Sequence, residues 1–259
     1  MPTLASVAAI APAAVVPSPR AVPADVAPEP FVERPWRRWR AHFERNRRRA
    51  LPSALGTGLP PTIAPAVAWS LARFQIGETG EGRIVGEIAA STITGVDDDY
   101  RRAVALFIAE EGRHAHILGR LVRALGGPLP SSTWTERAFT RVRRLAGVRV
   151  KMLAMFGAEV IGAAFYAALA AHLPPGATRA ALEQIAGDER AHLRFHRDFF
   201  ATQAPAGWRR GLFLLGWVPL AWAAAIAVGW DHRHTLWALR IGAGEMATRV
   251  HALVREGAR

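Results

Sequence analysis

Two glutamate–histidine pairs constrain the fold of this chain more than any other feature of its sequence. Each pair has the spacing Glu-x-x-His: Glu111 with His114, and Glu189 with His192. Both pairs lie in stretches whose apolar periodicity predicts helix. Residues three apart on a helix share one face, with about 5–6 Å between their Cβ atoms. A carboxylate and an imidazole at this spacing can therefore bind one metal ion from the same side.

A lone glutamate precedes each pair by the same interval. Glu81 lies 30 residues before Glu111, and Glu159 lies 30 residues before Glu189. With the two histidines, these four carboxylates form the ligand set of a di-iron or di-manganese centre in a four-helix bundle. Burying four acids in helices rich in Ala, Leu and Phe without a cation would be costly. We therefore predict a metal site; the alternative is a set of coincident charges on the surfaces of separate helices.

Two further acids are candidates to support the histidines. Glu110 lies four residues before His114, and Asp188 lies four residues before His192. Each acid is placed one helical turn from the histidine of its own helix, where it can accept the second ring N–H and fix the tautomer. The alternative is that both acids are simply solvated.

Other polar residues near the ligands leave alternatives open. The chain has two tyrosines, Tyr166 and Tyr100, and both align with the ligand stripe; they are expected to hydrogen-bond the site or relay electrons, or else to be ordinary core tyrosines. Glu78, one turn before Glu81, is the rival ligand from the first helix, and the equal intervals favour Glu81. The remaining candidates are interpreted as ordinary helix residues or left unassigned: His116, His172, His196 and Glu245.

The periodicity predicts an all-α fold in which residues 62–203 form a four-helix bundle. The four helices are expected at about 62–91, 97–125, 143–173 and 178–203. The acids at 97–99 supply a cap and first-turn charges for the second helix. The connection at 128–142 must cross the length of the bundle if both ligand pairs are to meet at mid-bundle, and about 15 extended residues can span more than about 40 Å.

Both ends of the chain lie outside this predicted bundle. Residues 1–33 are rich in Pro and Ala, which predicts a disordered tail and not a secretory signal. Residues 34–50 predict a basic amphipathic helix, because residues 34–49 hold eight arginines with aromatic residues spaced at three and four. Two interpretations of this helix remain: an anchor on an anionic membrane, or a solvated helix whose aromatic side chains pack on the bundle.

The C-terminal region, 208–259, predicts an apolar helix followed by a basic amphipathic one. Residues 211–230 contain no charged residue, which meets the length criterion for a membrane span. Pro219 and several alanines weaken that interpretation. A membrane span, an interfacial or hydrophobic-hairpin contact, and a buried helix all stay open. The final helix is expected at about 234–255.

The composition excludes several classes of function. None of the 259 residues is cysteine, so disulfides, thiolate metal sites and an attached iron–sulfur carrier are excluded. Electrons must then come from an external donor. The net charge of +12 favours acidic partners such as anionic lipid. Nucleic acid is not an expected partner, because no recognised reading motif accompanies the charge.

The segments EEGRHAHIL (110–118) and DERAHLRFH (188–196), together with Glu81 and Glu159, resemble the ferritin-like di-iron carboxylate superfamily. The resemblance covers residues 62–203 and is closest to its oxygen-activating branch: acyl-carrier-protein desaturases, aldehyde-deformylating oxygenases, N-oxygenases, multicomponent monooxygenases and rubrerythrins. It is specific for the metal site and unspecific for the substrate. Storage ferritins generally lack the second Glu-x-x-His pair, and a complete rubrerythrin would carry cysteines.

The resemblance implies an enzyme that activates O2 at two iron ions, with manganese or a mixed manganese–iron pair as alternatives. We expect it to desaturate, hydroxylate, N-oxidise or deformylate a small apolar substrate. Rival expectations are a ferroxidase or peroxide-protective protein, and a metal-dependent helical scaffold without turnover. The expected location is the cytoplasm, with membrane association through residues 34–49 and 211–230 as a further expectation.

Overall fold

The structure is a computed structural model that describes residues 35–50, 52, 58–79, 82–144, 147–204 and 207–259. All regular secondary structure in these ranges is helical, which confirms the predicted all-α class. The tail predicted at 1–33 and the candidate ligand Glu81 lie outside the described residues.

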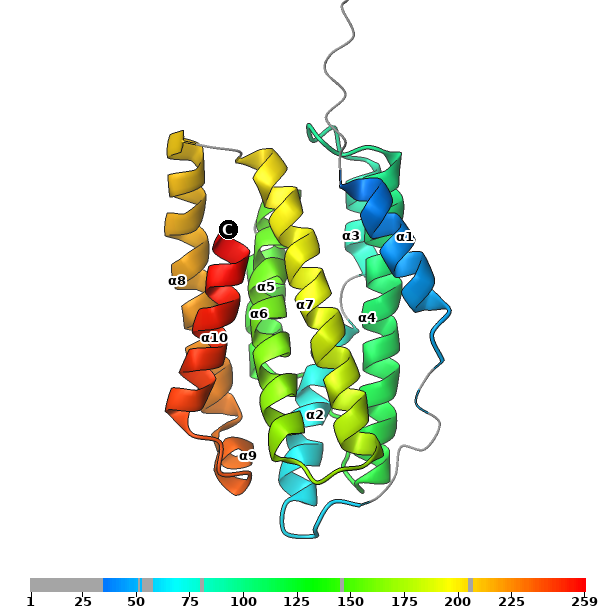
Figure 1. The fold of residues 1–259 in the computed structure, drawn as a ribbon, viewed down its shortest axis with the longest axis vertical. Helices are drawn as coiled ribbons and strands as arrows, with labels where there is room; N and C mark the ends of the chain where they lie inside the picture. The colour runs from blue at the N-terminus through cyan, green and yellow to red at the C-terminus, as the bar shows by residue number, and fades with distance from the viewer. Residues whose placement is uncertain (1–34, 51, 53–57, 80–81, 145–146, 205–206) are drawn as a thin grey trace, which may run out of the picture. The chain divides into compact units, whose positions relative to one another are not determined.

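Four long helices surround the middle of the molecule: α2 (Ala64–Glu78), α4 (Asp98–Ala124), α6 (Val148–His172) and α7 (Ala177–Gln203). Helix α2 packs on α4, and α6 packs on α7. In Figure 1, α4 and α6 both run from the top of the view to the bottom, while α2 and α7 run upward. The segment between α4 and α6 therefore has to return along the molecule, and it contains α5 (Trp134–Arg144).

The boundaries of α4 follow from local chemistry. The side chain of Asp97 accepts a hydrogen bond from the Tyr100 backbone N–H, and Asp98 and Asp99 lie in the first turn, as the sequence predicts. These groups satisfy and complement the free N–H groups of the helix N-terminus. At the other end Gly126 adopts a positive φ of 72°, a conformation that glycine reaches without strain.

Two predicted helices are interrupted. The helix expected at 62–91 ends at Glu78, and a separate helix, α3 (Gly82–Ala89), follows. The helix expected at 234–255 is divided into α9 (Arg233–Ala238) and α10 (Ala243–Ala258). Arg240 has a φ of 57° between them, which breaks the right-handed helical path that the apolar periodicity alone would continue.

Helix α1 (Trp36–Arg47) packs its aromatic side against the other helices. Trp36, Trp39 and Phe43 are buried, and the Trp36 indole N–H donates to the Gly95 carbonyl at 2.8 Å. Their rings contact Tyr100, Phe107 and Phe195. Of the two interpretations of residues 34–50, the structure favours packing. An anchor that buries these aromatic side chains in a membrane is therefore wrong.

Two helices, α6 and α8 (Gly207–Asp231), are long and apolar enough to cross a membrane. Most of α6 is buried as a core helix, whereas most of the apolar window of α8 is not buried. One side of α8 does pack on the rest of the molecule: the Trp217 ring stacks on Phe156 at 4.3 Å between centroids. Gly257 of α10 lies against the same two rings, where a Cβ atom would be 2.5 Å from Trp217.

Candidate metal centre

Helices α4 and α7 bring the two Glu-x-x-His pairs together in the interior. One ligand atom from each of Glu111, His114, Glu189 and His192 lies within 4.8 Å of all the others, and all four residues are buried. The pairs come from different helices, and each places its carboxylate beside the imidazole of the other. His114 Nδ1 is 3.0 Å from Glu189 Oε1, and His192 Nδ1 is 2.8 Å from Glu111 Oε1.

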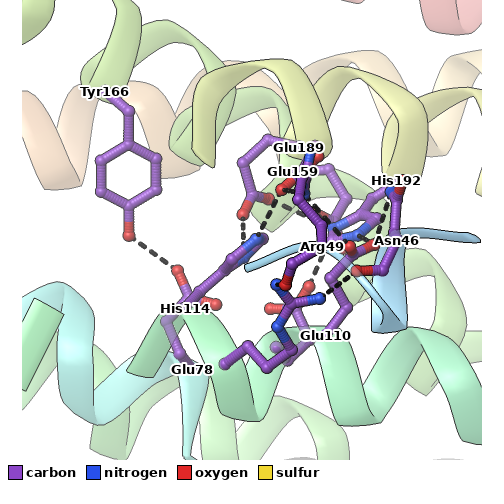
Figure 2. Close-up of polar contacts among 12 residues, drawn as sticks. Asn46, Arg49, Glu78, Glu110, His114, Glu159, Tyr166, Glu189 and His192 are labelled. Atoms are coloured by element: carbon purple, nitrogen blue, oxygen red, sulfur yellow. Dashed lines mark hydrogen bonds and ion pairs between the residues drawn. The ribbon is translucent and has the colours of Figure 1, made fainter. Parts of the chain in front are cut away.

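Helices α6 and α2 add a carboxylate each to this cluster. Glu159 of α6 is buried, and its Oε2 is 3.5 Å from His192 Nδ1. Glu78, the last residue of α2, interacts with Glu111 and accepts a hydrogen bond of 2.7 Å from the Tyr166 hydroxyl. Figure 2 shows Tyr166 pointing toward Glu78 beside the histidines. The described residue of the first helix at this cluster is thus Glu78, the rival considered in the sequence.

Each histidine uses its second ring nitrogen to contact a carboxylate of the opposite helix. His114 Nε2 lies 3.3 Å from Asp188 Oδ2, and His192 Nε2 lies 3.2 Å from Glu110 Oε2. The expectation that each acid serves the histidine of its own helix is therefore wrong. Each ring reaches across the space between α4 and α7, so its far edge faces the neighbouring helix and not the turn below it.

Helix α1 closes the side of the centre where Glu110 and Asp188 lie. Arg49, just after α1, pairs with both Asp188 and Glu110. Asn46 is within 3.4 Å of Glu110 Oε2, and Arg113 donates to the backbone carbonyls of Asn46 and Arg49. Figure 2 shows Arg49 and Asn46 beside Glu110 and His192. The basic segment therefore places positive charge beside the two acids that contact His114 and His192.

The buried carboxylates perturb one another strongly. Burial raises the pKa of Glu78 well above its usual value, and the neighbouring Glu111 raises it further. Burial and Glu189 likewise raise the pKa of Glu111, and burial and Glu159 raise that of Glu189. A bound divalent cation would remove the free-energy cost of burying these acids as carboxylates, because it replaces the protons that the acids would otherwise retain.

The histidines show the complementary effect. Burial alone would lower the pKa of His114, but Asp188 and Glu189 raise it well above the usual value. The pKa of His192 is also raised well above the usual value. Burial would lower it, but Glu111 and Glu110 raise it by more. In contrast, the pKa of Asp188 is lowered despite burial, because it accepts from His114 and Arg49.

The unsatisfied atoms of the cluster fit a metal. Glu111 Oε1, Glu189 Oε1, His114 Nδ1 and His192 Nδ1 are buried without a hydrogen-bond partner among the described residues. Buried polar atoms are normally hydrogen-bonded, whereas these four make only the close Nδ1–Oε1 contacts of 3.0 and 2.8 Å, and a cation could complete their pairing. Carboxylate oxygens and neutral imidazole nitrogens suit iron, manganese and other first-row divalent ions. The residues present therefore fit a metal centre.

Two other predicted residues have different surroundings. Tyr100 is fully buried in an aromatic cluster with Trp36, Phe195 and Phe199, and its hydroxyl has no hydrogen-bond partner among the described residues. This environment matches the core-tyrosine alternative. His196, interpreted as an ordinary helix residue, is fully buried with Nε2 3.3 Å from Glu159 Oε1. Its position four residues after His192, on the same helix face, was the signal that could have identified it.

A cavity of about 130 Å³, partly open to solvent, borders the carboxylates. Glu78, Glu111, Glu159 and Glu189 line one part of it, and mostly apolar side chains line the rest. His232 also lines the cavity, and its Nδ1 is hydrogen-bonded to the Ser70 hydroxyl. The Ser70 hydroxyl also donates to Thr235. Gly162 lies where α6 passes the centre, and a Cβ there would lie 3.2 Å from Glu189 Oε2, so a larger residue would press on that carboxylate.

Comparisons of the chain with protein-family models, curated proteins and solved structures give no match. The geometry of the centre is therefore the basis for a functional assignment.

Proposed function

We propose that this protein is a di-metal oxidoreductase of the ferritin-like type, most simply a di-iron oxidase or oxygenase acting on an apolar substrate. The observation that carries the proposal is the crossed arrangement at the histidines. In each ring, Nε2 contacts an outer carboxylate while Nδ1 faces an inner one without a hydrogen bond. Histidines that bind metals are usually fixed through their other ring nitrogen in this way.

The two metal ions would be held by residues of four helices. Glu111 and Glu189 lie between the two histidines, and Glu159 adds a carboxylate from α6. Glu78 supplies one from α2, with Tyr166 donating to it. When bound, a redox-active metal pair supplies the electron-transfer chemistry by which O2 oxidises a C–H or N–H bond. For a hydroxylation, substrate, O2, two electrons from an external donor and two protons give the hydroxylated product and water.

The protein residues have separable tasks around that chemistry. Asp188 and Glu110 orient the rings of His114 and His192, and Arg49 fixes those two acids in turn. Buried hydrogen bonds of this kind keep the ligands preorganised. The Phe107 ring lies edge-on to His192 at 4.8 Å and excludes water from that side.

The cavity supports an organic substrate. Phe107, Ala154, Met155, Ala158 and Ile161 give it an apolar wall next to the carboxylates. An apolar pocket with a few convergent polar groups is the usual form of a small-molecule site. A protein whose only product is oxidised iron or water has no need of such a wall, so the cavity favours the oxygenase over the ferroxidase or peroxide-protective alternative.

The test is oxygen consumption by iron-loaded, chemically reduced protein. We expect uptake faster than that of free iron, and loss of uptake in Glu111→Ala and His192→Ala. The matched control is His172→Ala, which removes a partly exposed histidine that pairs with Glu245 away from the centre. Equal uptake by protein and free iron would contradict the proposal. Reaction with hydrogen peroxide in preference to O2, with no organic substrate needed, would select the protective alternative.

A further inference from the structure

An apolar stripe runs along the outer side of α8. Its exposed positions follow intervals of three and four and end in tryptophan at both ends: Trp208, Leu212, Leu215, Pro219, Ala223, Ile226 and Trp230. The stripe covers 22 residue steps, or about 33 Å of helix. On the next helix, α9, the Trp237 side chain is 83 % exposed. Scattered exposed apolar residues are ordinary, but a continuous stripe of this length indicates a binding surface.

Positive charge borders this stripe. Arg209 lies at one end, and Arg233 and Arg240 lie at the other; all three are exposed. Arg233 lies over the Trp230 ring and donates to the Trp230 carbonyl. The acidic residue in 207–244 is Asp231, which is buried and bonded to Trp134. The face therefore presents arginine and tryptophan around an uncharged centre, the composition of helices that lie at membrane interfaces.

We propose that the outer face of α8 and α9 docks flat on an anionic lipid bilayer. The exposed apolar stripe enters the headgroup and acyl-chain boundary, and Arg209, Arg233 and Arg240 contact lipid phosphates. This surface is distinct from the metal centre, and the inference does not depend on the proposed reaction.

The packing of α8 excludes a membrane span by the folded protein. Trp217, Ala221 and Val228 on its inner side are buried. The same side packs on α6 and α10, and Gly257 of α10 fits against Trp217. Helix α10 carries exposed residues such as His251 and Arg255. A transmembrane orientation of α8 would have to bury those charges in hydrocarbon or separate α8 from its neighbours.

A second copy of the chain is a poorer occupant of this face. In a two-fold dimer the same patch meets itself, so the arginines would face one another without acidic partners. A second, largely apolar cavity lies between α6, α8, α9 and α10, with Ile226, Trp237 and Arg233 among its lining residues. A rigid protein surface would leave such a space unfilled, at a cost, whereas a lipid chain can enter it. The wall between this cavity and the metal-centre cavity includes Ile161 and Val228.

Flotation of the full chain with phosphatidylcholine vesicles, with or without phosphatidylglycerol, tests the proposal. We expect binding that increases with phosphatidylglycerol and weakens with salt. The double variant Leu215→Asp/Ile226→Asp changes exposed positions and should lower vesicle partitioning about tenfold or more. Replacing Arg209, Arg233 and Arg240 by Gln should lower binding to anionic vesicles by about fivefold per arginine.

Matched controls locate the surface. Val150→Asp changes an exposed apolar residue of α6, and a triple Gln variant of Arg37, Arg45 and Arg47 removes the same charge from exposed positions of α1. Both controls should bind like the wild type. The proposal is overturned if the wild type stays unbound, or if the α1 variant loses binding while the α8–α9 variant keeps it. It is also overturned if Leu215→Asp/Ile226→Asp dissociates a dimer in light scattering without affecting flotation.

Because the chain has no cysteine, single-cysteine probes can establish the orientation. Ala201→Cys in α7 and Thr248→Cys in α10 are exposed positions. Flat docking predicts that both react with a membrane-impermeant maleimide added outside vesicles that carry the bound protein. Protection of Thr248→Cys alone would show that α8 crosses the bilayer and would contradict flat docking.

Discussion

At His114 and His192, the two ring nitrogens have different environments. Asp188 and Glu110 take the outer nitrogen, so the inner nitrogen is left aimed at Glu189 or Glu111. Because these acids come from the opposite helix, the orientation of each ring depends on how α4 and α7 pack and not on its own helix alone.

Gly162 controls how closely Glu189 approaches α6. We predict that Gly162→Ala lowers metal affinity about tenfold, because the added methyl group would press on the carboxylate at 3.2 Å. Gly157→Ala on the same helix is the matched control, since a Cβ there meets nothing within 4 Å. It should leave affinity unchanged and raise helix stability by up to about 1 kcal/mol. Isothermal titration with zinc measures both, and equal affinities of the two variants would refute the role of Gly162.

His232 makes a separate prediction about pH. Burial lowers its pKa from 6.5 to about 4. Between these values the unfolded chain binds a proton that the folded protein does not, so stability falls as pH drops from 6.5 to 4. At about 1.4 kcal/mol per pKa unit, this loss is about 3 kcal/mol. Urea denaturation across this range should show a smaller loss for His232→Asn than for the wild type; identical slopes would contradict the assignment.

At the scale of elements, α1 acts as a cover for the centre. Its aromatic residues fill the space beside Phe107 and Phe195, and Arg49 follows immediately after it. The packing of the α1 aromatic residues in the core therefore fixes where Arg49 lies, and so where its positive charge meets Glu110 and Asp188.

We predict that Trp36→Ala destabilises the protein by about 3–5 kcal/mol, because the ring is fully buried and its N–H is bonded. Trp237→Ala is the matched control on an exposed side chain and should change stability by less than about 0.5 kcal/mol in the absence of lipid. Chemical denaturation gives both values. A small effect of Trp36→Ala would show that α1 is not part of the cooperative fold.

The sequence predicted the helices best where local signals were strong. Asp97 and Gly126 fix the limits of α4, and both signals depend on neighbouring backbone only. The break after Glu78 also had a local signal, since glycines stand at 77, 80 and 82, but the equal intervals to the two pairs outweighed it in the prediction of one helix over 62–91. Intervals along the chain could not reveal the crossed pairs of His114 with Asp188 and His192 with Glu110, because those contacts depend on the packing of two helices. For α1 the aromatic spacing identified the apolar side but could not show whether protein or membrane covers it.

At the scale of the whole molecule, the buried carboxylates of the centre oppose folding above pH 4.5 when no cation is bound. The pKa values of Glu78, Glu111 and Glu189 are raised from 4.5. The folded metal-free protein therefore holds protons that the unfolded chain releases, and this contribution to stability is lost as pH rises above 4.5. Metal binding should reverse the effect by favouring the folded state.

The variant Glu111→Gln distinguishes the metal-free protein, in which the carboxylates repel one another, from the metal-bound protein, in which they are ligands. In metal-free protein above neutral pH we predict a higher melting temperature than wild type, by about 2–4 °C for each kcal/mol of repulsion removed. With metal present the order should reverse, because the variant loses a ligand. Calorimetry with chelator and with excess zinc checks both signs, and Glu183→Gln, on the exterior of α7, serves as the control. A lower melting temperature of Glu111→Gln in chelator would refute the repulsion.

The most direct measurement of the central claim is X-ray absorption on protein loaded with iron(II) under anaerobic conditions, combined with metal analysis. The account predicts two iron ions per chain, a shell of oxygen and nitrogen ligands, and an iron–iron distance of roughly 3.5–4 Å. The stoichiometry should fall in Glu111→Ala and His192→Ala. One iron or none per chain, or two irons without a mutual distance signal, would contradict it.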